Sequence, residues 1–183
     1  MIATLCYLEK DNKYLMLYRN KKEIDINKGK WIGVGGKLEN GETPEQCLVR
    51  EVWEETGYKL NTYKYRGIVI FNYNEDEPLF IYVYTSSDFS GVEKECDEGE
   101  LKWISKDEVL NLELWEGDKI FLKLLFENSP FFYLTLDYEN DNVINSKLEF
   151  KQKYSCFEVF VPENYVEKIV ENLQKYSLLT VGL

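Results

Sequence analysis

Short apolar runs separated by polar turns fill most of the chain up to about residue 150, which is the pattern of β-strands. The run from Phe80 to Tyr84 has aromatic and β-branched residues in alternation, as expected of a strand covered on both faces. Asp11 and Asn12 predict a hairpin turn between the first two runs. The expected strands are residues 2–9, 13–19, 63–73, 79–87, 101–104, 131–138 and 143–150.

A helix is predicted over residues 44–56. Thr43 is a suitable N-cap, Pro44 suits the first helical position, and Gln46 completes a capping box. Gly57 stands where helices often end in a left-handed residue. One side of this helix is apolar and carries Cys47, Leu48 and Val52.

Two more helices are expected farther along the chain. Ser105 would cap residues 106–110, with Glu108 in the capping-box position. The segment 117–127 repeats apolar residues at helical spacing, which is more typical of a core-packing face than of a cofactor site. These apolar residues are Ile120, Phe121, Leu124 and Leu125.

The pattern predicts a main domain over residues 1–150 and a C-terminal extension over 151–183. In the extension, residues 157–161 favour a strand, and a helix is expected from Pro162 to about Tyr176. This β-α-β-like segment resembles half of a ferredoxin-like unit. Since its apolar end would be exposed if unpaired, we expect that it packs on the main domain or forms a dimer contact, or that the chain is truncated.

Composition limits the classes of function. The chain has 44% hydrophobic and 15% aromatic residues and a net charge of −11, so a basic footprint for a nucleic acid polymer is missing. No stretch is apolar enough for a membrane span, and the N-terminus lacks a leader pattern. We therefore expect a cytoplasmic monomer or homodimer that binds a free nucleotide and no membrane.

Histidine is absent, and the four cysteines form no CxxC pair. Both facts count against histidine catalysis and against a zinc site. Reduced thiols are the default in the cytoplasm. Carboxylates therefore remain as the available bases.

Three glutamates, Glu51, Glu54 and Glu55, share one side of the predicted 44–56 helix because they are spaced by i+3 and i+4. Carboxylates this close raise one another's pKa unless a cation lies among them. Hard oxygen ligands suit Mg²⁺, or Mn²⁺ in its place. Alone, an acidic run is more often a solvated helix face, but here glycines precede it and Arg50 adjoins it. The combination predicts metal-assisted displacement at phosphorus.

The spacing of the whole segment is more specific than its acids. Residues 35–58 read GGKLENGETPEQCLVREVWEETGY. They resemble the Nudix hydrolase signature at every spaced position: Gly36, Glu42, Arg50, Glu51, Val52, Glu54, Glu55, Gly57 and Tyr58. The resemblance implies an α/β/α sandwich around a mixed curved sheet and hydrolysis of a nucleoside diphosphate linked to another group.

The resemblance also implies roles for individual residues. Glu54, Glu55 and the Gly36 carbonyl would bind Mg²⁺, and Glu51 would be either a ligand or the base that activates water. Arg50 would orient a glutamate, and Glu42 would support the fold or a ligand. One acid of the 95–98 loop would add a metal ligand. Glu98 is preferred, with Asp97 and Glu95 as alternatives.

Beyond the signature, the chain is similar to the MutT branch, which hydrolyses oxidised purine nucleoside triphosphates. By this similarity Trp115 would pack on the base and Asp118 would bind its edge. Gly117 stands where a second acid is expected, and Ile32 stands where the animal form has an Asn. Both departures count against an identical mode of selecting 8-oxoguanine. Ile32 and Lys37 are also assigned to substrate binding, and Lys21, Lys22 and Lys28 are candidate phosphate contacts.

The leading hypothesis is therefore a pyrophosphohydrolase that converts an oxidised purine dNTP, such as 8-oxo-dGTP, to its monophosphate. A second hypothesis keeps the chemistry and changes the substrate to ADP-ribose, a dinucleotide, or an ordinary or pterin-type triphosphate. A third is a nucleotide sensor without catalysis. Retention of Glu51, Glu54 and Glu55 favours an enzyme over a sensor.

Overall fold

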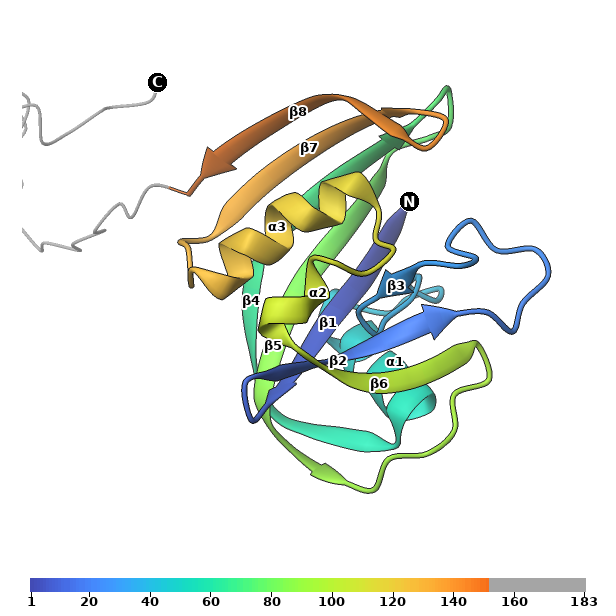
Figure 1. Cartoon of the computed structure of the whole chain (residues 1–183), viewed down its shortest axis with the longest axis vertical. Coiled ribbons are helices and arrows are strands. Elements are labelled where there is room, and N and C mark those ends of the chain that lie inside the picture. The colour runs from blue at the N-terminus through green and yellow to red at the C-terminus, as the bar shows by residue number, and fades with distance from the viewer. Residues whose placement is uncertain (152–183) are drawn as a thin grey trace, which may run out of the picture. The chain divides into compact units, whose positions relative to one another are not determined.

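The computed structural model describes residues 1–151, which form one compact unit. Within them the chain forms eight strands and three helices (Figure 1): β1 (Ile2–Lys10), β2 (Lys13–Arg19), β3 (Trp31–Ile32), α1 (Pro44–Thr56), β4 (Tyr58–Tyr73), β5 (Leu79–Gly91), β6 (Gly99–Ser105), α2 (Lys106–Val109), α3 (Glu116–Phe126), β7 (Phe132–Glu139) and β8 (Asn142–Phe150). The elements predicted in the C-terminal extension lie outside the described residues.

The strands form one mixed, curved sheet in the order β3-β2-β1-β5-β4-β7-β8, with β6 also paired to β2. Strands β1 and β5 run parallel, as do β4 and β7, while the β1–β2, β4–β5 and β7–β8 pairs are antiparallel. The predicted mixed α/β architecture is thus confirmed. No helix of the described residues is long and apolar enough to cross a membrane.

Helices α1 and α3 lie on opposite faces of this sheet. Thr4 of β1 contacts Cys47 of α1, with 3.4 Å between Oγ1 and Sγ. Tyr7 of β1 packs on Phe121 of α3, with 6.1 Å between ring centroids. Because side chains alternate along a strand, residues an odd number apart face opposite sides. The sheet is therefore the middle layer of a three-layer domain.

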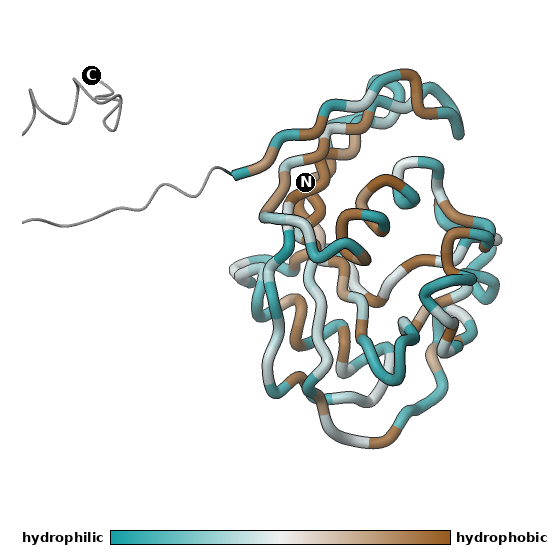
Figure 2. Tube along the Cα trace, turned by 60° about the vertical axis from the view of Figure 1, so that its left-hand side comes forward, coloured by the Kyte–Doolittle hydropathy of each residue, from teal (hydrophilic) through white to brown (hydrophobic). Residues whose placement is uncertain are grey.

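The core follows the alternation seen in the sequence. Apolar and polar positions alternate along strand segments of the trace (Figure 2). Strand β7 shows this pattern most regularly, since its Phe132, Leu134, Leu136 and Tyr138 are buried. At about 25 cal/mol per Å² of apolar surface, this burial is the main force that joins the layers.

The predicted turns and the α1 boundaries are confirmed. Asp11 and Asn12 both have positive φ, as a two-residue hairpin of the primed type requires. Thr43 and Gln46 form both hydrogen bonds of a capping box, and Gly57 ends α1 with φ of 77°. A side chain at Gly57 would also meet the Val92 carbonyl oxygen at 2.5 Å.

Three predicted features need correction. Ser105 makes no side-chain cap, and the helix after it ends at Val109. Strand β3, only two residues long, was not predicted because its pairing with β2 is long-range. Strand β4 begins at Tyr58, since polar residues pair with the end of β5 through register shifts that the alternation pattern does not show.

Candidate active site

The loop ahead of α1 is fixed against β1 by backbone hydrogen bonds. Val34 exchanges hydrogen bonds with Cys6, and the Thr4 N–H donates to the Gly36 carbonyl at 2.9 Å. Gly35 has φ of 150°, and a Cβ there would collide with the Thr4 carbonyl oxygen. Only glycine fits this close approach. The loop therefore runs antiparallel beside β1 in a fixed position.

Glu55 is the most deeply buried of the three α1 glutamates, with 6% of its surface exposed. Its Oε2 accepts a hydrogen bond from the Gly35 N–H at 2.7 Å. Its Oε1 is buried without a hydrogen-bond partner among the described residues. The pKa of this carboxyl is raised from 4.5 to about 8, chiefly by burial; the nearby Glu51 and Glu98 also raise it, while the Gly35 N–H and Arg19 oppose the shift.

Glu51 lies directly against the same loop. A Cβ at Gly36 would collide with the Glu51 carboxylate, so the absence of a side chain at Gly36 makes room for it. Burial raises the pKa of Glu51, although Arg50 opposes the shift. Glu54 is half exposed, and it contacts the same Arg50 nitrogen as Glu51. The three acids therefore differ in environment despite their uniform spacing.

Arg50 organises this group of acids. Its Nε and Nη2 donate to Glu42 at 2.7 and 2.9 Å, and its Nη1 donates to Glu51 at 2.8 Å and to Glu54 at 3.1 Å. These contacts lower the pKa of Glu42 to about 2. The predicted role of Arg50 in orienting glutamates thus has a geometric basis. Glu42 holds the guanidinium in place, and the guanidinium in turn holds Glu51 and Glu54.

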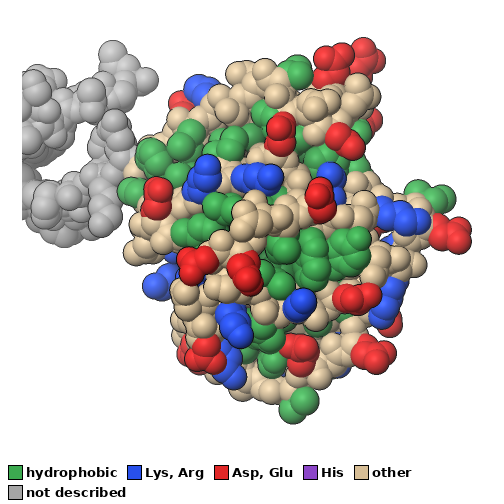
Figure 3. All heavy atoms as spheres, in the orientation of Figure 1, with side chains coloured by type: hydrophobic (Ala, Val, Ile, Leu, Met, Phe, Trp, Pro, Cys, Tyr) green, Lys and Arg blue, Asp and Glu red, His purple; other side chains and the backbone are tan. Residues whose placement is uncertain are grey.

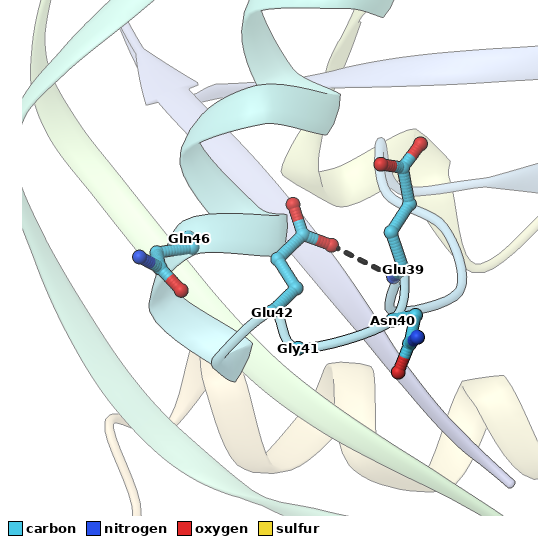
Figure 4. A pocket seen from close by; sticks show the side chains of 5 residues that line it. All are labelled: Glu39, Asn40, Gly41, Glu42 and Gln46. Carbon is cyan, nitrogen blue, oxygen red and sulfur yellow. Dashed lines mark hydrogen bonds between the residues drawn. The ribbon is translucent and has the colours of Figure 1, made fainter.

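Glu42 also closes the turn before α1. Its Oε2 accepts a hydrogen bond from the Glu39 N–H at 2.9 Å (Figure 4). The open pocket drawn there, about 310 Å³, is lined by Glu39, Asn40, Gly41, Glu42 and Gln46. None of these residues is a predicted metal ligand, so this pocket is a surface feature of the turn.

Glu98 directly precedes β6. It forms ion pairs with Arg19 and with Lys22, and Arg19 Nη1 lies 3.7 Å from Glu55 Oε1. The structure thus brings Glu98 to the α1 acids through Arg19. In residues 1–151, however, no three acidic side chains converge on a single point that could hold a metal ion. The carboxylates instead turn toward the arginines and the Gly35 N–H.

Several residues predicted to bind metal, phosphate or substrate make hydrogen bonds within the protein. The Gly36 carbonyl accepts hydrogen bonds from the Thr4 N–H and from the Cys47 thiol, the latter at 3.4 Å. Lys21 donates to the Cys96 carbonyl at 2.7 Å, and Lys28 to the Glu23 carbonyl at 3.4 Å. Lys37 is exposed, with its carbonyl accepting from Arg50 at 3.3 Å.

Trp115 is buried in an aromatic cluster formed with Phe71, Tyr73 and Tyr138, whose ring centroids lie 5.5 to 6.2 Å from its own. Its Nε1–H donates to Asn27 Oδ1 at 2.9 Å. Lys30 Nζ lies over the indole ring, 4.7 Å from its centroid. The predicted base-packing residue is therefore already enclosed by protein groups.

Asp118 lies in the first turn of α3, beside this cluster. Burial raises its pKa from 3.8 to about 7, and the positive charge of Lys30 opposes the rise. Ile32, on β3, is buried and has no polar side-chain atom. The residues assigned to the base thus supply one carboxyl and one indole ring, and other aromatic rings pack around the indole.

Several residues near the acids and the aromatic cluster escaped sequence reasoning, notably Arg19, Asp25, Asn27 and Lys30. All four lie at the end of β2 or in the loop after it, where the sequence shows only a polar stretch. The single available signal was a charged residue ending the otherwise apolar β2. The order of polar and apolar residues does not reveal which acid, distant in the sequence, pairs with such a charged residue.

Comparisons with known proteins agree with this geometry. The NUDIX domain model matches residues 1–125. The oxidized purine nucleoside triphosphate hydrolase of Danio rerio is 28% identical over 129 residues, covering 70% of this chain and 83% of that protein. The NAD-capped RNA hydrolase NudC of Haemophilus influenzae (strain PittEE) is 30% identical over 97 residues, covering 52% and 36%.

Among solved structures, the MutT protein from Bacillus halodurans superimposes with a TM-score of 0.73 at 28% identity, covering 81% of this chain and 97% of that one. The matched region contains the complete glutamate helix and its glycine loop. The chain therefore belongs to the Nudix family of pyrophosphohydrolases.

Proposed function

We propose that this chain is a Mg²⁺-dependent pyrophosphohydrolase that converts an oxidised purine dNTP, such as 8-oxo-dGTP, to the monophosphate and pyrophosphate. The observation that carries the hydrolytic part is the packing of Glu51 and Glu55 against the Gly35–Gly36 backbone, with Glu55 Oε1 buried and without a hydrogen bond. Burying a carboxylate oxygen without a hydrogen-bond partner costs free energy, so this oxygen suggests that a cation binds there.

The residues fit a hard divalent ion. Carboxylate oxygens are its preferred ligands, and an ion among them would favour the ionised form that burial disfavours. Glu51, Glu54, Glu55 and Glu98 would hold it. Strand alternation turns the Gly35 carbonyl away from β1, toward the side where its N–H meets Glu55, whereas the Gly36 carbonyl is used by β1. We therefore add the Gly35 carbonyl as a candidate beside Gly36.

Chemical roles follow from the environments of the acids. A bound divalent ion neutralises charge on phosphate oxygens. Glu51 suits the base that accepts a proton from water, because its pKa is raised and Arg50 fixes its direction. Arg50 also restrains Glu54. The cytoplasm, with its nucleotide pool, is the compartment that this function requires.

The oxidised-purine part of the proposal has separate support. Burial raises the pKa of Asp118 to about 7, and a carboxyl with such a pKa could accept or donate a hydrogen bond at a base edge near neutral pH. The aromatic cluster around Trp115 offers planar surfaces once a ring moves. The zebrafish relative named for oxidised purine nucleotides adds weight.

The hydrolytic role is tested by Glu54→Gln at saturating Mg²⁺, which we expect to lower kcat by at least about 100-fold while the fold is kept. Glu45→Gln is the matched control, because Glu45 lies on the same helix and contacts Tyr84 instead of the acid group. Near-normal turnover by Glu54→Gln would refute the assignment.

A second substrate class is favoured by one observation: buried Ile32 offers no hydrogen bond to a base. ADP-ribose, a dinucleotide or an ordinary triphosphate would then replace the oxidised purine. Comparison of kcat/KM for 8-oxo-dGTP, dGTP, ADP-ribose and a dinucleotide separates these options. Binding of all four without turnover in Mg²⁺ would instead indicate a sensor.

A further inference from the structure

Arg19 joins the loop after β2 to the acids of the active site. Its backbone closes the loop, since its N–H donates to the Lys30 carbonyl at 3.0 Å and its carbonyl accepts from the Gly29 N–H at 2.8 Å. Its side chain leaves in the other direction, toward Glu98 and Glu55. One residue thus fixes the loop and touches two proposed metal ligands.

The charge balance around Arg19 is incomplete. Its guanidinium is 9% exposed and faces Asp25, Glu55 and Glu98, which are 8%, 6% and 29% exposed. Even with Lys22 on Glu98, these three carboxyls outnumber the two cationic side chains, and Glu55 Oε1 remains without a hydrogen bond. A divalent cation bound to Glu55 and Glu98 would supply positive charge to the same carboxyls. The Arg19 guanidinium therefore supplies some of the positive charge that such a cation would bring to Glu55 and Glu98.

Asp25 limits how far Arg19 can move. Arg19 Nε donates to Asp25 Oδ2 at 2.7 Å, and Asp25 Oδ1 accepts from the Asn27 N–H at 2.9 Å. Asn27 in turn accepts the hydrogen bond from Trp115. A continuous set of contacts thus connects the aromatic cluster with the acids.

We propose that Arg19 is the built-in counter-ion of the acidic site: it pairs with Glu98 and Glu55 when no divalent cation is bound, and it competes with that cation for them. The proposal rests on the metal role assigned to these acids above. Arg19 is a positioning residue, because it acts through Glu98 and Glu55. Asp25 draws the guanidinium away from the acids and so favours the cation.

The test is a calorimetric titration of the full chain with Mn²⁺ alone. Removing a positive charge beside a cation site should strengthen binding, so Arg19→Met is expected to lower the Mn²⁺ Kd about tenfold. Asp25→Asn removes a negative charge and frees Arg19 for Glu98, so its Kd should rise severalfold. A merely structural role predicts weaker binding for both variants.

Lys22→Met is the control, because Lys22 pairs with Glu98 but is 51% exposed. Its change should stay within about twofold, as expected for a screened surface pair. An unchanged or raised Kd for Arg19→Met overturns the proposal. If that variant does not fold, a lowered or unchanged Kd for Asp25→Asn overturns it. Failure of the unaltered chain to bind Mn²⁺ would instead refute the metal role itself.

Discussion

Glu55 illustrates how its surroundings decide the behaviour of one residue. Its sequence neighbours are acids, yet repulsion is not the largest influence on it. Burial contributes most to raising its pKa to about 8, while a single N–H from Gly35 stabilises one oxygen. Because the unfolded carboxyl titrates near 4.5, the folded chain retains a proton that the unfolded chain has lost. Between these values, stability must fall as pH rises.

This linkage predicts a pH-dependent melting temperature. In EDTA, the Tm should fall by several degrees between about pH 5 and pH 8, since ionising buried Glu55 costs folding free energy. Glu55→Gln imitates the protonated form and should reduce that fall. Calorimetric melting of both proteins across this range measures the difference. The raised pKa of Asp118 lowers the Tm with rising pH in both proteins alike, so it does not affect the difference between them.

Mn²⁺ provides the complementary measurement. Added to the unaltered chain at pH 8, it should recover much of the lost Tm, because ligands that bind only the folded state stabilise it. It should have little effect on Glu55→Gln. Parallel pH profiles for the two proteins in EDTA would contradict the assigned protonation of Glu55.

At the scale of elements, α1 and α2 show what local sequence can and cannot specify. Both begin with a hydroxyl residue followed three positions later by Gln or Glu. Thr43 caps α1 with both reciprocal hydrogen bonds, whereas Ser105 makes none. Ser105 still belongs to β6, where it pairs with Lys13 of β2. The sheet therefore sets its backbone, and the local capping signal is overridden.

This contrast gives a paired prediction. Thr43→Ala should lower the free energy of unfolding by about 1 kcal/mol, the usual value of an N-cap. Ser105→Ala should change it by less than about 0.5 kcal/mol, because no cap is lost. Urea denaturation of both variants provides the values. Equal losses would show that Ser105 caps α2 in solution.

At the scale of the whole molecule, the last hairpin is coupled to the proposed base site. The Gly117 N–H donates to the Tyr138 hydroxyl at 2.8 Å, which joins the start of α3 to β7. A side chain at Gly117 would also collide with Leu136. Trp115 and Asp118 flank this contact.

On the face drawn in Figure 3, acidic and basic side chains are interspersed between apolar patches, despite the overall charge of −11.

Loss of this contact should affect both stability and binding. Tyr138→Phe leaves a buried N–H without an acceptor, so we expect a loss of about 1–3 kcal/mol in unfolding free energy. Nucleotide affinity should fall as well, because α3 is less firmly placed. Tyr133→Phe, on the opposite face of β7 and 38% exposed, is the control. A stability loss without any change in nucleotide binding would place the base site elsewhere.

The sequence by itself determined the elements that depend on neighbours a few residues apart. Alternation located every strand of residues 1–151 except β3, two turn residues located the first hairpin, and the capping pattern located α1 to the residue. The spacing of the glutamates identified the family. Each of these is a short-range signal, encoded in backbone preference and periodicity.

Only the tertiary structure decided which charges meet. Arg19 and Glu98 are 79 positions apart, and Trp115 and Asn27 are 88 apart. Sheet pairing on β1 placed the Gly36 carbonyl, and packing enclosed Trp115. Such contacts arise from the order of strands and the layers above them, because burial and long-range pairing have no local pattern in the chain.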